Sequence, residues 1–416
     1  MSQLVPLSDL VLPSQLDAER QRHQALAGAF HQAFPQSRER IRLFSSPGRT
    51  EVAGNHTDHQ RGRVLAAAID LDILFAAAPN QAEEVRLISS GYPLVTIRLD
   101  ELSVRPSERF STAALVRGIC SVLRQSGKRV AGFDVCVDGQ VPAGAGLSSS
   151  AAFEVGLARV VSELFNTQPL SPMECALAGQ RAENEYFGKP CGLMDQAACA
   201  LGGCVFIDFA NLQAPEVRSV PLQSLFNDYT LLITNTGGSH AELNAEYEAL
   251  EHEMKIVAQK LGHEELRAVT REVFLEAVPR LRGSVSDRAL LRAFHYFEDD
   301  ARVIAQEAAL REGANAAFLR MVRQSGESSF MYCQNCYCPG VHQSQEVAIG
   351  LMLSHALLGQ EGAWRVHGGG FAGTIAAFVP KRLVARYRTE LGKTFGTDAV
   401  HAVTVRKHGA VEINAV

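Results

Sequence analysis

The chain has 416 residues, of which 46% are apolar and 20% are charged, a balance typical of a soluble globular protein. Its formal net charge of -5 excludes the broad basic surface that binds nucleic acid or an anionic membrane, so any polyphosphate ligand must be held by a local site. Because one hydrophobic core seldom serves a chain of this length, we expect two domains with a cleft between them.

The first predicted element is a helix over residues 14–34 that ends near Pro35. Apolar residues at helical spacing give this helix a candidate buried face. The face consists of Leu16, Ala25, Leu26 and Phe30. Since the region lacks the basic-then-apolar pattern of a secretory signal, we expect a cytoplasmic protein.

The segment Pro47 to His59, PGRTEVAGNHTDH, crowds charged and hydrogen-bonding side chains between two glycines and an apolar strand. Such a density suits a polyhydroxylated ligand, because fixed donors and acceptors can read the hydroxyls of a sugar ring. A polar surface loop has the same kind of composition. Taken alone, the segment leaves both interpretations open.

Runs rich in Val, Ile and Leu then predict four strands. They are Val64–Ala78, Val85–Ser90, Val95–Leu99 and Gly132–Val137. The first and most apolar of these is interrupted by Asp70 and Asp72, which argues against a membrane span and a membrane partner. A helix is predicted at Thr112–Gln125, before the last of the four strands.

A glycine-serine loop follows this last strand, in PAGAGLSSSAA, and runs into an apolar helix, Phe153 to Phe165. Gly144 and Gly146 let backbone N–H groups approach an anion, and the helix start adds unpaired donors and a favourable dipole. Three serines, Ser148, Ser149 and Ser150, offer a helix cap and hydroxyls for phosphate or hydrated magnesium. The loop is neither a Walker loop nor a dinucleotide fingerprint. A glycine-rich turn with a serine cap is the alternative.

A third segment, RAENEYFGKPCGLMDQ, predicts a helix that ends at Gly188 and Pro190 and a turn that delivers Asp195. Glu183 on this helix could ligate a metal while Asp195 points at substrate, so the two carboxylates could divide magnesium and proton-handling roles. Two solvated surface carboxylates are the alternative.

The second half of the chain predicts further helices and strands. Residues spaced by three and four from Leu243 to Leu261 predict an amphipathic helix of about five turns. Similar periodicity predicts helices at Asp287–Arg311 and Gln343–Leu358, and strands are predicted at Tyr229–Thr234, Gly373–Val379 and Ala402–Arg406. A composition shift near residues 210–230 places a domain boundary.

Two other features of the sequence lack a clear chemical reading. The nine cysteines, an odd number, do not describe a disulfide framework, so reduced thiols are expected. Cys333, Cys336 and Cys338 have no second cysteine pair or histidine pair beside them, which favours buried thiols over a zinc site. The glycine run Gly368–Gly370 requires a close backbone approach, either to a ligand or to another part of the chain.

Together and in this order, the four polar or glycine-rich stretches resemble the GHMP small-molecule kinases and, within them, the galactokinases. In the first stretch Arg49, Gly54, His56, Thr57 and Asp58 match the galactokinase pattern. The GAGLSSSAA, PCGLMDQ and HGGGFAG strings match the later motifs. The resemblance implies an α+β fold of two domains with the active site in the cleft between them, the N-terminal domain covering residues 1–212 and the C-terminal domain residues 213–416, with late strands crossing back.

The resemblance also implies an ATP-dependent sugar 1-kinase. Asp195 would take the proton from the anomeric hydroxyl of D-galactose as it attacks the γ-phosphate of ATP, giving galactose 1-phosphate and ADP, and Arg49 would stabilise the developing charge. Such a transfer depends mainly on positioning and on charge neutralisation. Ser150 and Glu183 match the family's Mg²⁺ ligands. The triphosphate loop would consist of Gly144, Ala145, Gly146, Leu147, Ser148, Ser149 and Ser150.

The sugar, by the same resemblance, would lie against residues of the first and third stretches and a tyrosine of the predicted amphipathic helix. These residues are Asn55, His56, Asp58, Gly192 and Tyr247. For Tyr247 a role in the core is the alternative. The adenine pocket and the oligomeric state are not predicted.

Departures from the family pattern fall on the sugar side. Asn55 stands where galactokinases have a glutamate that helps to bind the C6 hydroxyl, Glu51 stands where they have an asparagine, and His59 replaces a tyrosine. A neutral amide still hydrogen-bonds a hydroxyl but does not repel a C6 carboxylate, so galacturonate is an alternative substrate. The segment Ser329 to Glu346 also departs from the pattern and is assigned no role.

Three further alternatives stay open. The protein could phosphorylate another sugar. It could be a galactokinase-like sensor that binds sugar and ATP without turnover, although it keeps Asp195, Arg49, Ser150 and Glu183. It could also be a GHMP kinase for a non-sugar alcohol such as mevalonate or homoserine, which the His56-Thr57-Asp58 string disfavours.

Overall fold

A computed structural model describes residues 4–142, 146–238 and 244–414 of the chain. It contains helices and strands in both halves. The strands, in chain order, are β1 (Arg42–Ala53), β2 (Arg63–Pro79), β3 (Glu84–Ser89), β4 (Val95–Arg98), β5 (Phe133–Gly139), β6 (Cys204–Asp208), β7 (Glu216–Ser219), β8 (Tyr229–Gly237), β9 (Ala363–His367), β10 (Gly373–Pro380), β11 (Val400–Val403) and β12 (Val411–Ile413).

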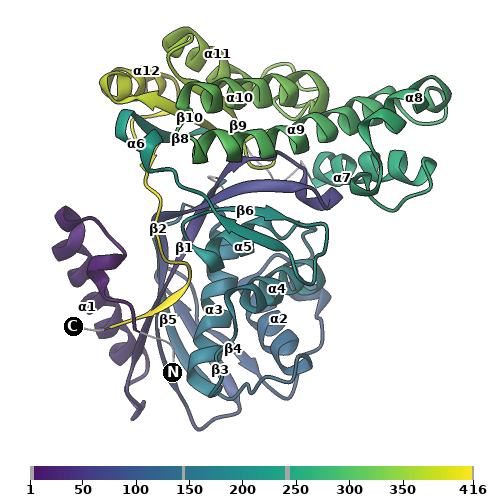
Figure 1. Ribbon diagram of the computed structural model, residues 1–416. Helices are drawn as coiled ribbons and strands as arrows, with labels where there is room; N and C mark the ends of the chain where they lie inside the picture. The colour runs from purple at the N-terminus through teal and green to yellow at the C-terminus, as the bar shows by residue number, and fades with distance from the viewer. Residues whose placement is uncertain (1–3, 143–145, 239–243, 415–416) are drawn as a thin grey trace.

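These strands form two sheets within the described ranges. The first sheet has the order β12-β1-β2-β5-β3-β4, with β6 paired to β2 and β7 paired to β6. The second has the order β11-β8-β10-β9 and lies in the upper body of Figure 1. Strand pairing is antiparallel except between β3 and β5. The four strands predicted between residues 64 and 137 are confirmed as β2 to β5.

Helices cover both faces of the first sheet and surround the second. They are α1 (Leu16–Ala33), α2 (Thr112–Gln125), α3 (Ser149–Phe165), α4 (Pro172–Ala182), α5 (Met194–Leu201), α6 (Gln223–Asp228), α7 (Asn244–Lys260), α8 (Arg271–Leu281), α9 (Asp287–Arg311), α10 (Asn315–Ser328), α11 (Glu346–Leu358) and α12 (Val384–Phe395). α1 lies on one side of the first sheet and α2 to α5 lie on the other (Figure 1). The predictions at 112–125 and 287–311 match α2 and α9 at both ends.

Alternation along β2 explains this three-layer arrangement. Leu74 and Ala76 pack in the cluster with Phe30 of α1, whereas Phe75 and Ala77 pack in the cluster on the opposite face. Successive side chains of a strand point to opposite faces, so a strand covered on both faces carries apolar residues at most positions. The most apolar run of the sequence is therefore a strand buried on both faces over most of its length. None of the helices in the described ranges is long and apolar enough to cross a membrane.

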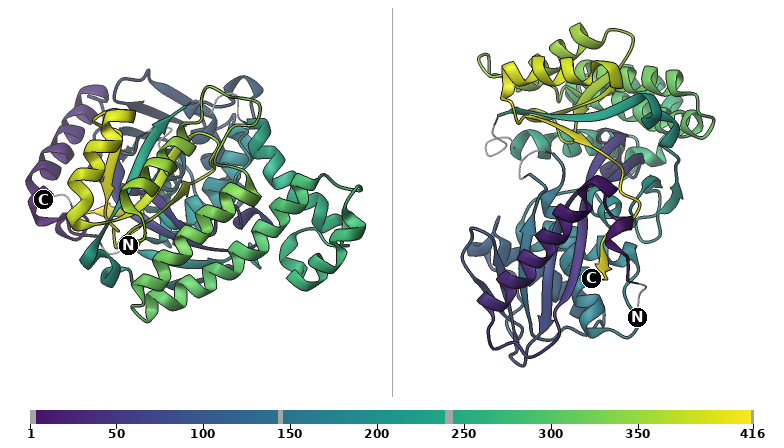
Figure 2. Two further views of the ribbon diagram at one scale, coloured as in Figure 1. Left: turned by 90° about the horizontal axis from the view of Figure 1, so that it is seen from above. Right: turned by 90° about the vertical axis from the view of Figure 1, so that its left-hand side faces the viewer.

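We call the first sheet with its helices the first body and the second sheet with its helices the second body. The chain crosses from the first body to the second and returns to the first at its end. After β11, the backbone of Arg406 pairs with Ala68 of β2, and β12 then pairs with β1. The two ends of the chain consequently lie close together, and Val5 bridges Ile413 (Figures 1 and 2). β7 lies after residue 212 and still belongs to the first sheet. The domain boundary at residue 212 stays a prediction.

Two details of the predicted helices are wrong. Ala25 is exposed, because the buried face of α1 is formed by His23, Leu26 and Phe30. The predicted helix at 343–358 begins later, at Glu346, and it is apolar on all sides, so Ile349 and Met352 remain exposed.

Helix α3 packs on the first sheet at a glycine, which gives a test of this packing. A Cβ on Gly156 would overlap the ring of Phe75. We expect Gly156→Ala to lower the free energy of unfolding by about 1–3 kcal/mol, because overpacking must be relieved by shifting the ring or the helix. Urea denaturation monitored by circular dichroism measures the change.

Gly28 in α1 is the matched control, since no atom lies within 4 Å of a Cβ built there. Gly28→Ala should raise the free energy of unfolding by roughly 0.5–1 kcal/mol, from helix propensity alone. Equal effects of the two substitutions would contradict the packing that the structure gives to α3.

Candidate active site

The polar segment predicted to read a ligand begins on β1 and continues into a tight loop, residues 54–60, which we call the acceptor loop. Gly54 has φ 87°, and a Cβ there would overlap the carbonyl of Arg63, so the position requires glycine. The hydroxyl of Thr57 donates to the backbone oxygen of Arg63 at 2.6 Å, and the backbone oxygen of Gly54 lies 3.0 Å from the same hydroxyl. The loop is therefore tied to the start of β2 as a rigid unit.

Arg49 of β1 and Asp195 at the start of α5 form a bidentate ion pair. Nε and Nη2 of Arg49 lie 2.7 and 2.6 Å from the two carboxylate oxygens. The Arg49 side chain is 6% exposed and that of Asp195 is 30% exposed. Burial on its own would raise the pKa of Asp195, but the charge and hydrogen bonds of Arg49 and a hydrogen bond from Ser148 outweigh it and lower this pKa. Asp195 is therefore ionised at neutral pH.

The glycine-serine loop lies directly against this pair. Arg49 donates from Nη1 to the carbonyl of Gly146 and from its backbone N–H to the carbonyl of Leu147, the latter at 3.1 Å. Ser148 takes the left-handed conformation, with φ 59°. Gly144 and Ala145, which we predicted as part of the loop, lie outside the described residues.

Ser148 occupies the cap position of α3 but does not cap it. Its hydroxyl donates to Oδ2 of Asp195 at 2.6 Å, and no side-chain cap bond is formed. The cap predicted at Ser148 is therefore wrong, and the left-handed backbone of this residue differs from the extended conformation of a capping serine. Ser149 and Ser150 form the first turn of α3, whose backbone N–H groups have no acceptor within the helix. This arrangement suits an anion at the helix start.

The predicted metal ligands lie on the other side of this first turn. Ser150 donates to Oε1 of Glu183 at 3.0 Å, and Nζ of Lys189 lies 3.4 Å from the same oxygen. In the part of the chain that the structure describes, no group of three His, Cys, Asp or Glu side chains could hold a metal by itself. A hydroxyl and a carboxylate nevertheless suit Mg²⁺, which takes few protein ligands when phosphate oxygens supply the rest.

Glu154 is a charged residue of this region that the sequence reasoning missed. It is fully buried in α3, and Nε2 of Gln196 donates to Glu154 at 3.1 Å and to Glu183 at 2.8 Å. Its Oε1 has no hydrogen-bond partner within the described ranges. Burial and the nearby charge of Glu183 raise its pKa well above the ordinary value. A glutamate within the apolar run AAFEVGLA was the available signal. An unpartnered buried oxygen next to Glu183 fits a site that receives a cation.

Asp58 and Gly192 lie against each other near Asp195. The carboxylate of Asp58 lies where a side chain on Gly192 would be, so only glycine fits there. Burial raises the pKa of Asp58, His59 opposes this rise, and the charge of Asp195 adds to it. The two carboxylates therefore sense each other, and the structure brings together Asp58, Gly192 and Asp195 as predicted.

His56 and Tyr247 both contact the glycine run. Nε2 of His56 donates to the carbonyl of Gly369 at 2.9 Å, and Nδ1 lies 3.1 Å from Nε2 of His59. Because a carbonyl only accepts, His56 carries its proton on Nε2, and burial lowers its pKa to about 3. The hydroxyl of Tyr247 donates to the carbonyl of Gly370 at 2.8 Å, and its ring lies where a side chain on Gly369 would be. The close approach predicted for the glycine run is thus an approach to the chain itself.

Asn55 is placed differently from the other predicted sugar contacts, because it is fully buried and its amide is engaged by protein. Oδ1 accepts from Ser329 at 3.2 Å and from Asn335 at 2.9 Å. Nδ2 donates to Oε1 of Glu51 at 3.1 Å and to the carbonyl of Gly368 at 2.8 Å. These bonds use both lone pairs and both hydrogens of the amide. Ser329 and Asn335 belong to the segment to which the sequence assigned no role.

The neighbouring cysteines take no part in this chemistry. Cys333 and Cys336 are fully buried, and burial raises the pKa of both thiols.

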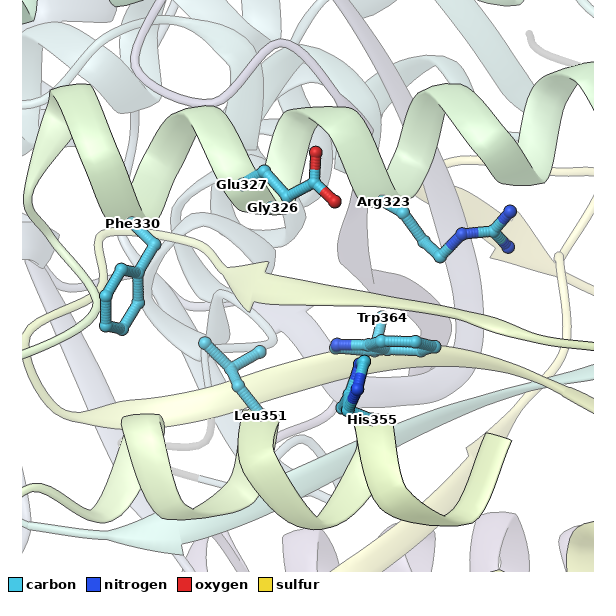
Figure 3. A pocket seen from close by; sticks show the side chains of 7 residues that line it. All are labelled: Arg323, Gly326, Glu327, Phe330, Leu351, His355 and Trp364. Atoms are coloured by element: carbon cyan, nitrogen blue, oxygen red, sulfur yellow. The ribbon is translucent and has the colours of Figure 1, made fainter. Parts of the chain in front are cut away.

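A hollow of about 180 Å³ also lies apart from the site, between α10, β9 and α11 (Figure 3). Its lining consists of Arg323, Gly326, Glu327, Phe330, Leu351, His355 and Trp364, none of them a predicted site residue.

Comparison with known proteins agrees with this geometry. A model of the N-terminal domain of GHMP kinases matches residues 114–203, and a model of the galactokinase galactose-binding signature matches residues 28–79. Galactokinase from Lactococcus lactis, solved with galactose, superposes with a TM-score of 0.81 at 24% identity over 93% of this chain and 99% of that one.

More distant kinases share the architecture. The Methanococcus jannaschii mevalonate kinase gives a TM-score of 0.61 at 16% identity over 89% of this chain and 99% of that one. Phosphomevalonate kinase from Streptococcus pneumoniae, solved with phosphomevalonate and AMPPNP, gives 0.58 at 12% identity over 89% and 99%. The two family matches and the shared architecture make this chain a galactokinase-like protein with the GHMP kinase fold, and they indicate a phosphotransferase.

Proposed function

We propose that the protein transfers the γ-phosphate of ATP to the anomeric hydroxyl of D-galactose, giving galactose 1-phosphate and ADP. The observation that carries this proposal is the Arg49–Asp195 pair, in which an ionised, partly exposed carboxylate lies between the glycine-serine loop and Asp58. A polyphosphate bound at the start of α3 and a sugar bound at Asp58 would meet at this carboxylate.

Each residue of the proposed site then has a role that its contacts support. Asp195 orients the attacking hydroxyl and accepts its proton as the oxygen–phosphorus bond forms; its lowered pKa makes it a weak base, so orientation is the larger part of its task. Arg49 stabilises the charge on the transferring group. Ser150 and Glu183 would hold Mg²⁺, which neutralises phosphate charge when bound. Backbone N–H groups at the start of α3 hold the triphosphate.

The acceptor side supports a sugar. Asp58 offers carboxylate oxygens to hydroxyls, while His56, Gly192 and Tyr247 shape the surrounding wall. The galactose-binding signature covers residues 28–79, which include the acceptor loop, and this favours galactose.

Galacturonate is the second candidate, on one specific observation. The acceptor loop has a neutral amide at Asn55, and the nearby carboxylate of Glu51 is paired with the guanidinium of Arg365. A C6 carboxylate would therefore meet no unpaired negative charge from these two residues.

A coupled ADP-release assay with ATP and Mg²⁺ tests the function. The acceptors are galactose, galacturonate, glucose, N-acetylgalactosamine and arabinose. We expect turnover on galactose, no turnover when the metal is removed with a chelator, and product that is phosphorylated at C1. No turnover on galactose would contradict galactose as the substrate. Inactivity on every sugar would contradict a sugar kinase, and mevalonate and homoserine are included as acceptors to test the non-sugar alternative.

Asp195→Asn tests whether Asp195 accepts the proton of the attacking hydroxyl. The amide keeps the shape and still accepts from Arg49, but it cannot take a proton, so kcat should fall by roughly 10²–10⁴-fold while galactose still binds. Single-turnover kinetics and calorimetry measure the two quantities. Substantial remaining turnover would mean that another group accepts the proton.

Arg49→Gln tests, through the pH dependence of kcat/KM, whether Arg49 keeps Asp195 ionised. In the native protein the lowered pKa keeps Asp195 ionised, so kcat/KM should show no titration of this group near neutrality. Without the guanidinium, burial becomes the dominant influence and raises the pKa of Asp195, so the acid limb of the profile should move to higher pH. Arg288→Gln, which removes a guanidinium paired with Glu253 in the second body, should leave the limb in place. An acid limb that moves equally in both variants would contradict the assignment.

A further inference from the structure

The acceptor loop is fixed to the second body through the backbone of Asn55 as well as its side chain. The N–H of Asn55 donates to Asp299 at 2.9 Å, and its carbonyl accepts from Nε2 of His295 at 2.9 Å. Asp299 and His295 are fully buried residues of α9. With Ser329, Asn335 and Gly368, the second body thus holds this one residue of the loop from several directions.

A buried ion pair stands behind the amide of Asn55. The carboxylate of Glu51, on β1, pairs with the guanidinium of Arg365, on β9, and the two side chains are 2% and 1% exposed. The same Oε1 of Glu51 accepts from Asn55 at 3.1 Å. The pair therefore joins the two sheets and determines which way the amide of Asn55 can face.

Arg365 depends on this pairing for its own stability in the interior. Burial lowers the pKa of its guanidinium to about 9, which still leaves it protonated at neutral pH. Neither Nη1 nor Nη2 has a hydrogen-bond partner among the residues that the structure describes, so the guanidinium is held by the ion pair between Nη2 and Glu51 and by Nε, which donates to the carbonyl of Val366 at 3.0 Å. Gly326 of α10 makes room for the residue, since a Cβ there would lie 3.1 Å from the Cβ of Arg365. Within the described ranges, the fold therefore places a charge at this position and compensates it with the carboxylate of Glu51.

We infer that Arg365 is a positioning residue for the sugar side of the site, acting through Glu51 and Asn55 to hold the acceptor loop with Asp58 against Gly192. Arg365 acts at a distance from the reacting groups, through these two intermediates. The loop is rigid between Gly54 and Arg63, so a displacement of Asn55 is transmitted to Asp58. This inference rests on the proposed function for its kinetic readout and goes beyond it by making a residue of the second sheet a determinant of acceptor binding.

Three variants test the inference with whichever sugar the acceptor assay identifies. Arg365→Met leaves Glu51 buried without a cation, and Glu51→Gln leaves Arg365 without an anion. Each should raise the KM for the sugar by roughly tenfold or more while the KM for ATP changes less than about threefold, since a broken buried pair leaves an uncompensated charge. The double variant removes both charges, and the amide introduced by Glu51→Gln can still accept from Asn55. It should return the sugar KM to within about threefold of the native value.

A second ion pair, with a buried arginine and a partly exposed glutamate, serves as the control. Arg117 and Glu108 form a bidentate pair in and before α2, away from the site. Arg117→Met and Glu108→Gln should change the unfolding midpoint without changing the ratio of the two KM values. Equal changes in the KM for sugar and for ATP, singles without effect, or a double variant no better than the singles would each overturn the inference.

Amide hydrogen exchange separates this inference from the proposed function, because it needs no substrate. Exchange of residues 54–60 should become at least about tenfold faster in Arg365→Met and in Glu51→Gln, and should return toward the native rate in the double variant. If no sugar is phosphorylated, the proposed function fails while the exchange result still decides the positioning role. Unchanged exchange in both single variants overturns that role.

Discussion

A carboxylate taken out of water must be paired with a cation or keep a proton, and the structure around the site follows from this constraint. Asp195 is paired with Arg49, and Glu51 is paired with Arg365. Glu154 receives a hydrogen bond from the neutral amide of Gln196 instead, and its raised pKa accordingly favours the protonated form. Arg49 and Arg365 therefore supply the cations for Asp195 and Glu51, whereas Glu154 has no such partner among the described residues.

Both ion pairs start from residues of one strand. β1 carries Arg49, whose partner is on α5, and Glu51, whose partner is on β9, so adjacent parts of a single strand are bound to the first body and to the second. Bulges on either side of this stretch break the regular pairing with β2. Such irregularities change the direction of side chains at functional sites. Here they flank the stretch in which Arg49 is bound to the first body and Glu51 to the second.

The sequence predicted two contacts of this arrangement. Its motifs singled out Arg49, Ser150, Glu183 and Asp195, and the structure brings Arg49 to Asp195 and Ser150 to Glu183, while the chemical role of each stays a prediction. Regular elements such as α2 and α9 were found because periodicity is a local property. Arg365, Ser329 and Asn335 were missed because their roles exist only across the interface between the two bodies. The same limit explains Asn55: residue type suggested a sugar contact, whereas the available hydrogen-bond capacity depends on distant neighbours.

The charges on the two sides of the glycine-serine loop differ, and the difference decides on which side a cation is stabilised. On one side Asp195 is already neutralised by Arg49 and receives a hydrogen bond from the hydroxyl of Ser148. On the other side, Glu183 and Glu154 share one Gln196 amide, and Lys189 is the cation that lies beside Glu183. A cation entering the second side would be attracted by the carboxylate of Glu183 and would favour loss of the Glu154 proton, whereas a cation entering the first would compete with an arginine in a bidentate pair. In the proposed function, this difference would place Mg²⁺ at Ser150 and Glu183 and leave Asp195 to face the acceptor, the division of roles that phosphoryl transfer between two bound substrates requires.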